Sequence, residues 1–198
     1  MNGLIAVEHR VDVLTMNSQR MTTSPLLPGA LVPAFEPHPW LRSGHAQTVV
    51  GRYLVNGGRR LIATGHVIEL EDGDRLLVLE SIPERWTEGD PGAVLIHGLA
   101  GCANAAYVVR FGRRLVRMGV RVVRMNLRGA GRGFGLARGI YHAGRSGDVR
   151  RVIEWLARRV PGSPLVVAGF SLGASLTLRL AAEAAADPVE GLDCVLAA

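Results

Sequence analysis

The residues of this sequence best suited to chemistry form the pentapeptide Gly169-Phe170-Ser171-Leu172-Gly173, a G-x-S-x-G pattern. A short apolar run, Leu165–Ala168, precedes it, and a helical stretch rich in Ala and Leu follows over residues 172–185. Glycines on both sides of the serine let strand and helix approach closely and lift the hydroxyl clear of a sheet. We therefore predict that Ser171 is a nucleophile. The simpler alternative is a tight turn in which Ser171 caps the helix.

A second loop, His97-Gly98-Leu99-Ala100-Gly101, follows another apolar run upstream. In such an arrangement the backbone N–H groups of Leu99 and Leu172 would form an oxyanion hole. Each donor of this kind contributes on the order of 10²–10³ in rate. The N-terminus of the helix behind the serine favours the same developing negative charge. The supporting loop residues are His97, Gly98, Gly169 and Gly173, and we expect His97 to hold the loop rather than to transfer protons.

The elements that must position these loops alternate along the chain. Turn residues 71–74 lie between two strand-like runs, which predicts an antiparallel hairpin. Further on, continuous apolar runs alternate with stretches of helical period, which predicts a doubly wound, mostly parallel sheet with helices on both faces. The expected strands cover residues 67–70, 75–79, 93–96, 120–127, 165–168 and 192–196, and the expected helices cover 105–118, 148–160 and 172–185. Asp148 is expected to cap the second of these helices.

The chain before these elements lacks the regular spacing of apolar residues that predicts strands and helices. Residues 1–34 show no clear period and become Pro-rich towards their end, which predicts a flexible or extended leader. Residues 35–198 are expected to be the N-terminal part of a single domain, and a short helix is expected to end near Leu54.

Several consecutive motifs resemble the signatures of α/β-hydrolases. They are His97-Gly98-Leu99, Asn126 to Gly131, Tyr141 to Asp148, and Gly169 to Gly173. With Pro39 to Thr48 added, the chain resembles the YheT-like branch, hydrolases related to the mammalian abhydrolase-domain esterases and lipases. The similarity covers roughly Phe35 to the end of the chain.

This resemblance implies a serine esterase that cleaves carboxylic esters, either of small molecules or of lipids, with no metal and no organic cofactor. Since the fold does not fix the reaction, a thioesterase, an amidase or a cofactor-free haloperoxidase on the same scaffold is an alternative. A second alternative is a binding module that keeps the pocket and has lost the chemistry. Labelling of Ser171 by a fluorophosphonate would separate an activated nucleophile from a binding module.

The catalytic acid and base are missing from the expected order. In this fold the triad follows as serine, then Asp or Glu, then His, but the 27 residues after Ser171 contain no histidine. Two further strand–helix units, roughly 60 residues at about 30 each, would be needed to carry them. We expect none of the six upstream histidines to serve as the base. The sequence therefore predicts a hydrolase domain that is incomplete at its C-terminus, either a fragment or a truncated copy. We expect the 198 residues alone to be inactive. We also expect the last strand to lie at the sheet edge and to be prone to aggregation.

Composition limits the classes of partner and the cellular setting that we expect for this protein. The formal net charge is +6, but all 23 basic residues are Arg and they are spread along the chain, so we expect a solvated basic face and no nucleic-acid partner. The two cysteines form no metal or disulfide pattern, which favours a reducing, cytoplasmic setting. No uncharged run long enough for a transmembrane segment is present without Gly and Pro breaks. The sequence leaves the oligomeric state open.

Overall fold

The computed structural model of this chain describes residues 36–53 and 61–198. The predicted leader, residues 1–34, lies outside this part of the chain, so the boundary proposed at residue 35 stays a prediction. Residues 36–42 belong to a different unit from Ser43–Ala198. The expected short helix is present as α1, Gly44–Tyr53. The hydroxyl of Ser43 accepts the N–H of Ala46 at 3.1 Å and so caps its first turn.

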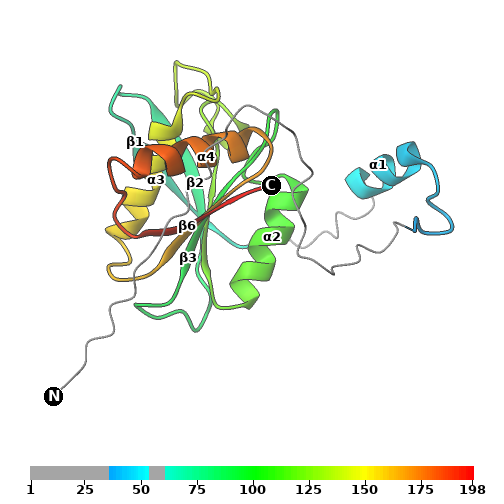
Figure 1. Ribbon diagram of the computed structural model, residues 1–198, viewed down its shortest axis with the longest axis horizontal. Helices are drawn as coiled ribbons and strands as arrows, with labels where there is room; N and C mark the ends of the chain where they lie inside the picture. The colour runs from blue at the N-terminus through cyan, green and yellow to red at the C-terminus, as the bar shows by residue number, and fades with distance from the viewer. Residues whose placement is uncertain (1–35, 54–60) are drawn as a thin grey trace, which may run out of the picture. The chain divides into compact units, whose positions relative to one another are not determined.

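From residue 61 onwards, three strands are followed by alternating helices and strands, and all six strands form one sheet (Figure 1). The strand order is β1-β2-β4-β3-β5-β6. The strands are β1 Thr64–Glu69, β2 Arg75–Ser81, β3 Gly92–Ile96, β4 Arg121–Met125, β5 Leu165–Gly169 and β6 Leu192–Ala197. The helices are α2 Ala106–Arg117, α3 Ser146–Ala157 and α4 Leu172–Ala184, with a short 3-10 turn, η1, at Gly131–Gly133.

The pairing of the strands follows from their sequences. The turn at residues 70–74 folds β1 back on β2 as an antiparallel hairpin, with Gly73 at a φ of 80°. In β3 and β4 every residue is buried, and both strands pair in parallel, as do β5 and β6. Apolar side chains on both faces of a strand require cover on both sides, which the helices supply. The predicted mostly parallel sheet with an antiparallel opening is confirmed.

Helices α2, α3 and α4 pack against the sheet in two layers (Figure 1). One core cluster joins the sheet to the stripe of α3, which includes Val149, Val152 and Ile153, and to Leu176 and Leu180 of α4. A second, smaller cluster joins Leu95, Val122 and Ala168 of the sheet to α2, through Val108. This division places the helices on both faces, as expected for a doubly wound sheet.

A buried arginine ties the loop between β4 and α3 to the hairpin. The guanidinium of Arg128, 3% exposed, donates from Nε and Nη2 to the two carboxylate oxygens of Asp148, both at 2.7 Å. Its Nη1 donates to Asp74 at 2.7 Å and to Asp72 at 2.6 Å. These hydrogen bonds raise the pKa of Arg128 further above its usual range, and the pKa of Asp72 is lowered in return. A bidentate contact of this kind fixes both groups in one geometry.

The expectation that Asp148 caps a helix is wrong. The N-cap position of α3 is Arg145, which makes no side-chain capping bond, and Asp148 lies inside the first turn. Its carboxylate instead belongs to the Arg128 cluster. Asp74, another carboxylate of the cluster, also accepts the backbone N–H groups of Arg138 and Gly139, both at 3.0 Å. These two hydrogen bonds are the largest cause of the lowered pKa of Asp74.

The last strand, β6, lies at one edge of the sheet and pairs only with β5 among the described strands. Four of its six residues are exposed, including Cys194 and Leu196. Asp193 is exposed at this edge, and its carboxylate accepts the N–H of Leu165 in β5 at 2.9 Å. An uncovered edge of this kind offers unpaired backbone groups to another strand.

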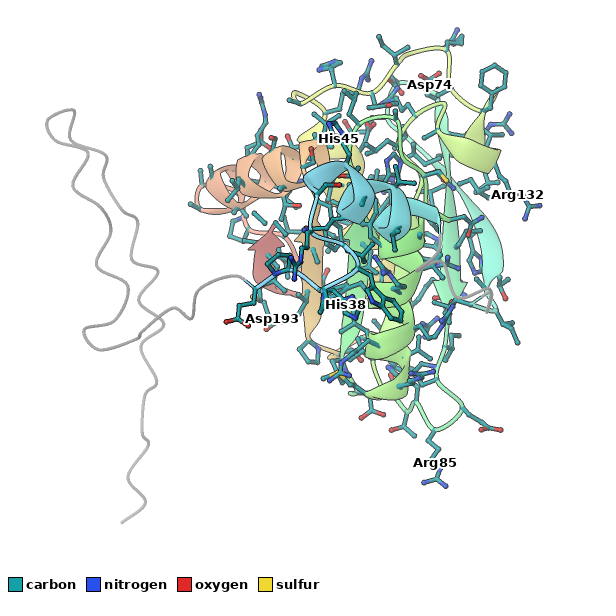
Figure 2. The ribbon with its side chains drawn as sticks, turned by 90° about the vertical axis from the view of Figure 1, so that its right-hand side faces the viewer. His38, His45, Asp74, Arg85, Arg132 and Asp193 are labelled. Carbon is teal, nitrogen blue, oxygen red and sulfur yellow. The ribbon has the colours of Figure 1, made fainter. Side chains whose placement is uncertain are left out.

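The Arg128 cluster generates a prediction about stability. Arg128→Met keeps a long apolar side chain but leaves the buried carboxylate of Asp148 without its cation. We expect the free energy of unfolding to fall by about 3 kcal/mol. The matched control is Arg132→Met, because Arg132 points into solvent (Figure 2), and it should change stability by less than about 0.5 kcal/mol. Urea unfolding followed by circular dichroism measures both, and equal effects would contradict the structural role of Arg128.

Candidate active site

Ser171 lies on a sharp turn between β5 and α4, with its residue exposed to solvent. Its backbone has a φ of 53° and a ψ of −115°, a conformation that L-residues rarely adopt. It occupies the N-cap position of α4, yet its side chain makes no capping hydrogen bond. The simpler reading, a capping serine, is therefore not what the geometry shows. The hydroxyl is left available above the sheet.

The two glycines of the motif allow this turn because any side chain there would collide with backbone. A Cβ at Gly173 would come within 2.6 Å of the carbonyl oxygen of Ile96 in β3. A Cβ at Gly169 would collide with the carbonyl of Gly173 and the hydroxyl of Thr177. The first turn of α4 thus presses directly on the ends of two neighbouring strands. This contact fixes the height of Ser171 above the sheet.

The loop that follows β3 lies beside Ser171, as the sequence predicted. A Cβ placed on Gly98 would lie 3.0 Å from the Cβ of Ser171 and 3.1 Å from the carbonyl oxygen of Phe170. The residue after it, Leu99, is 74% exposed. The structure therefore brings together the two loops whose backbone amides were expected to act jointly.

His97 is completely buried beneath this loop, with 0% of its surface exposed. Its Nδ1–H donates to the carbonyl of Gly98 at 2.7 Å, and its Nε2 accepts the N–H of Leu127 at 3.2 Å. Because Nε2 accepts, the ring is in the neutral Nδ1–H tautomer. Burial lowers the pKa of His97 and keeps it neutral. Both nitrogens are thus used to hold backbone, which agrees with the structural role expected for this residue.

In the loop, the amides on either side of Leu99 are occupied. The N–H of Gly98 donates to the hydroxyl of Tyr107 at 2.8 Å, and the N–H of Ala100 donates to the hydroxyl of Tyr141 at 3.0 Å. Ala100 itself has a positive φ of 55°. Among the described residues, the N–H of Leu99 has no hydrogen-bond partner.

The elbow shows the same pattern. The N–H of Ser171 donates to the carbonyl of Ala198 at 2.8 Å, and that of Gly173 donates to the carbonyl of Phe170 at 2.9 Å. The N–H of Leu172, between them, finds no acceptor in residues 36–53 or 61–198. Leu172 is also the first residue of α4, so its amide carries the partial positive charge of the helix N-terminus. Both predicted oxyanion donors are therefore unoccupied.

Sequence reasoning missed the partners that hold this arrangement. Tyr141 begins one of the motifs that resemble α/β-hydrolases, Tyr141 to Asp148. A tyrosine at that position does not by itself indicate that its hydroxyl accepts the N–H of Ala100. Tyr107 sits one residue before Val108 on the buried side of α2 and gave no signal beyond a packing aromatic. Only the chain's three-dimensional course brings the two hydroxyls to the same loop.

No metal or membrane feature accompanies the site in the described residues. Three or more His, Cys, Asp or Glu side chains are nowhere grouped so that they could hold a metal ion there. Within the same ranges, no helix combines the length and the apolar character needed to cross a membrane.

Comparison with known proteins yields matches among relatives and solved structures. Over 124 residues the chain is 30% identical to the protein named "Putative esterase YheT" of Escherichia coli (strain K12), covering 62% of this chain and 36% of that protein. An α/β serine hydrolase without a lid from Xanthomonas campestris is 31% identical, with a TM-score of 0.54 over 61% of this chain and 56% of that one. The esterase Pf2001 of Pyrococcus furiosus, 22% identical, shares the fold, with a TM-score of 0.54 over 67% and 49% of the two chains.

The chain thus spans about a third of YheT and about half of the two solved structures. The described fold agrees with these matches, since the order of strands and helices and the mostly parallel sheet are those expected from the resemblance. A family model described as the α/β hydrolase fold matches residues 94–196, just over half of the 198 residues, so the chain belongs to the α/β hydrolase fold family.

Proposed function

We propose that this chain carries the nucleophile and the oxyanion hole of a serine hydrolase that cleaves carboxylic esters. The observation that carries the proposal is the exposed, strained Ser171 beside two backbone amides, of Leu99 and Leu172, that have no other partner among the described residues. Family membership and the relatives named as esterases or serine hydrolases support the same reaction class.

In the proposed reaction the Oγ of Ser171 attacks the ester carbonyl carbon while a general base takes its proton. The carbonyl oxygen becomes an oxyanion that accepts the N–H groups of Leu99 and Leu172. Collapse of this tetrahedral intermediate expels the alcohol, which takes up the proton, and leaves an acyl group on Ser171. Water then attacks the acyl-enzyme through the same steps and releases the carboxylic acid.

The substrate class is an ester with an apolar acyl group, of a small molecule or a lipid. Phe170 precedes the nucleophile, and its ring makes edge contacts with Tyr107 and Phe111, at centroid distances of 5.1 and 5.7 Å. On the other loop, Leu99 is 74% exposed and offers an apolar contact to such an acyl group. Both cysteines are free, which supports the proposal that the protein works in the cytoplasm.

We propose that none of the histidines in these 198 residues acts as the general base. His97 is the histidine of the loop that contacts Ser171, and both its nitrogens are already bonded to backbone. No histidine follows Ser171 in the sequence. By itself the chain is then expected to keep only the contribution of the oxyanion hole, a residual on the order of 10³–10⁴-fold over water.

The lack of an internal base can be tested by activity. We expect these 198 residues to hydrolyse p-nitrophenyl esters no faster than an oxyanion hole alone allows, on the order of 10³–10⁴-fold over water. A steady-state assay with p-nitrophenyl acetate measures this rate. Full turnover by the 198-residue chain would overturn the proposal about the base while leaving Ser171 in place.

Ser171 can be tested on the chain as it stands. A fluorophosphonate should label Ser171 slowly, and added imidazole should raise the labelling rate by about tenfold. Free imidazole can supply only part of the rate enhancement of a positioned general base, which is on the order of 10²–10⁴. Peptide mass spectrometry should find the label on Ser171, and Ser171→Ala should abolish it. The matched control is Ser175→Ala, which removes an exposed hydroxyl one turn further along α4. Absence of label with imidazole present would favour a binding module without chemistry.

The structural role of His97 predicts a dependence of stability on pH. Burial lowers the pKa of His97 in the folded chain below the ordinary 6.5. As the pH falls below that value, the unfolded chain therefore binds more protons at this residue than the folded chain does. The free energy of unfolding should therefore be highest above about pH 6.5 and fall at lower pH, by at most about 1.4 kcal/mol per pH unit from this group.

His97→Gln should remove this part of the slope between pH 7.5 and about pH 5.5, although it costs stability overall. His142→Gln is the control, because His142 is exposed. Urea unfolding at several pH values gives the slopes, and an unchanged slope in His97→Gln would count against the buried neutral ring. If His97 were the general base instead, the same variant would lose all labelling of Ser171.

A further inference from the structure

Two tyrosine hydroxyls bracket Leu99, the residue whose N–H was assigned to the oxyanion. Tyr107 comes from the first turn of α2, and Tyr141 comes from the loop between β4 and α3. Each hydroxyl accepts one backbone N–H, that of Gly98 or that of Ala100. The two elements reach the loop from different parts of the chain, yet they engage alternate amides and leave the middle one open.

The direction of the Leu99 N–H follows from the peptide group to which it belongs. In a trans peptide the N–H points opposite to the preceding carbonyl, and no cis peptide is present in the described residues. That carbonyl, of Gly98, accepts the Nδ1–H of His97 at 2.7 Å and the N–H of Gly101 at 3.1 Å. Two donors therefore hold the carbonyl on one side, and the Leu99 amide faces the other.

The tyrosines hold the peptide groups on either side of this one. Without the Tyr107 hydroxyl the N–H of Gly98, a buried residue, would lose its acceptor. Ala100 keeps a positive φ of 55°, which a non-glycine residue adopts at a cost, and the Tyr141 hydroxyl compensates by accepting its N–H. If either contact is released, the loop can rotate and the Leu99 amide can turn away from Ser171.

Both rings are themselves fixed by the site. Tyr107 packs edge-on against Phe170, the residue before the nucleophile, with centroids 5.1 Å apart. Tyr141 packs edge-on against His97, with centroids 6.2 Å apart. Tyr107 thereby connects the elbow, which carries one donor, to the loop that carries the other.

We propose that Tyr107 and Tyr141 are positioning residues that set the direction of the Leu99 N–H in the oxyanion hole. This inference rests on the proposed function, because it assigns a role within the same site. Neither hydroxyl touches the reacting atoms in this scheme, and their effect reaches the oxyanion through the backbone of residues 98–100.

The test uses the 198-residue chain, with Tyr107→Phe and Tyr141→Phe, which keep the rings and remove only the hydroxyls. The measured quantity is the second-order rate constant for labelling of Ser171 by a fluorophosphonate in the presence of imidazole. Since complete loss of an oxyanion donor costs on the order of 10²–10³, misdirection of one donor should slow labelling by about tenfold in each variant. Ser175→Ala, which also removes a hydroxyl near the site, should leave the rate unchanged.

A second readout is independent of the serine chemistry. Amide hydrogen exchange followed by NMR should be faster at Gly98 in Tyr107→Phe and at Ala100 in Tyr141→Phe, while the thermal midpoint shows whether each variant stays folded at the assay temperature. Slower labelling together with faster local exchange in a folded variant supports the inference.

The failures are distinguishable. If the parent chain is labelled and both Phe variants react at the parent rate, the positioning role is overturned and the proposed function stands. If exchange at Gly98 and Ala100 is unchanged, the hydroxyls do not hold the loop and the inference is likewise overturned. If the parent chain is not labelled with imidazole present, the proposed function fails, and this role fails with it.

Discussion

The arrangement of the site depends on one close approach, that of the first turn of α4 to the ends of β3 and β5. Gly169 and Gly173 permit it because a Cβ at either position would meet backbone atoms. With the helix seated this deeply, the connection from β5 has room only for a turn that holds Ser171 at a positive φ. Such a conformation persists only where the surroundings over-determine it. Here the surroundings are the buried strands, so the strength of the parallel sheet is what maintains the strained turn.

A second constraint on the same site is a set of ion pairs and hydrogen bonds that connects it to the β1–β2 hairpin. Arg128 links the β1–β2 turn, through Asp72 and Asp74, to α3, through Asp148. Asp74 in turn accepts two backbone N–H groups at residues 138–139, just before Tyr141. The antiparallel hairpin, which lies at the opposite edge of the sheet from β6, thus fixes the loop that delivers a hydroxyl to Ala100. Buried ion clusters of this kind add little net stability over apolar packing, but they require one geometry, and geometry is what this loop must supply.

The sequence predicted the framework because its signals are local. Continuous apolar runs gave β3, β4 and β5 to within two residues, turn residues gave the hairpin, and the G-x-S-x-G spacing gave the elbow between β5 and α4. The contacts that it did not predict join residues far apart in the chain. Asp148 has the position and type of a helix cap, and only its pairing with Arg128, twenty residues earlier, shows that it has another role. Tyr107 and Tyr141 look like packing aromatics until the fold brings their hydroxyls to alternate amides of one loop.

Backbone groups and side-chain groups contribute to the proposed site in different ways. Both proposed oxyanion donors are amides whose directions are set by local structure, the loop after β3 and the start of α4, and these two segments follow the neighbouring strands β3 and β5. A general base, by contrast, must be a side chain held within hydrogen-bond reach of the serine hydroxyl, and His97 of the loop after β3 already has both ring nitrogens bonded to backbone. Electrostatic preorganisation, often the largest single contribution to catalysis, is therefore a property that this part of the fold can possess on its own, ahead of the proton transfer that would make use of it.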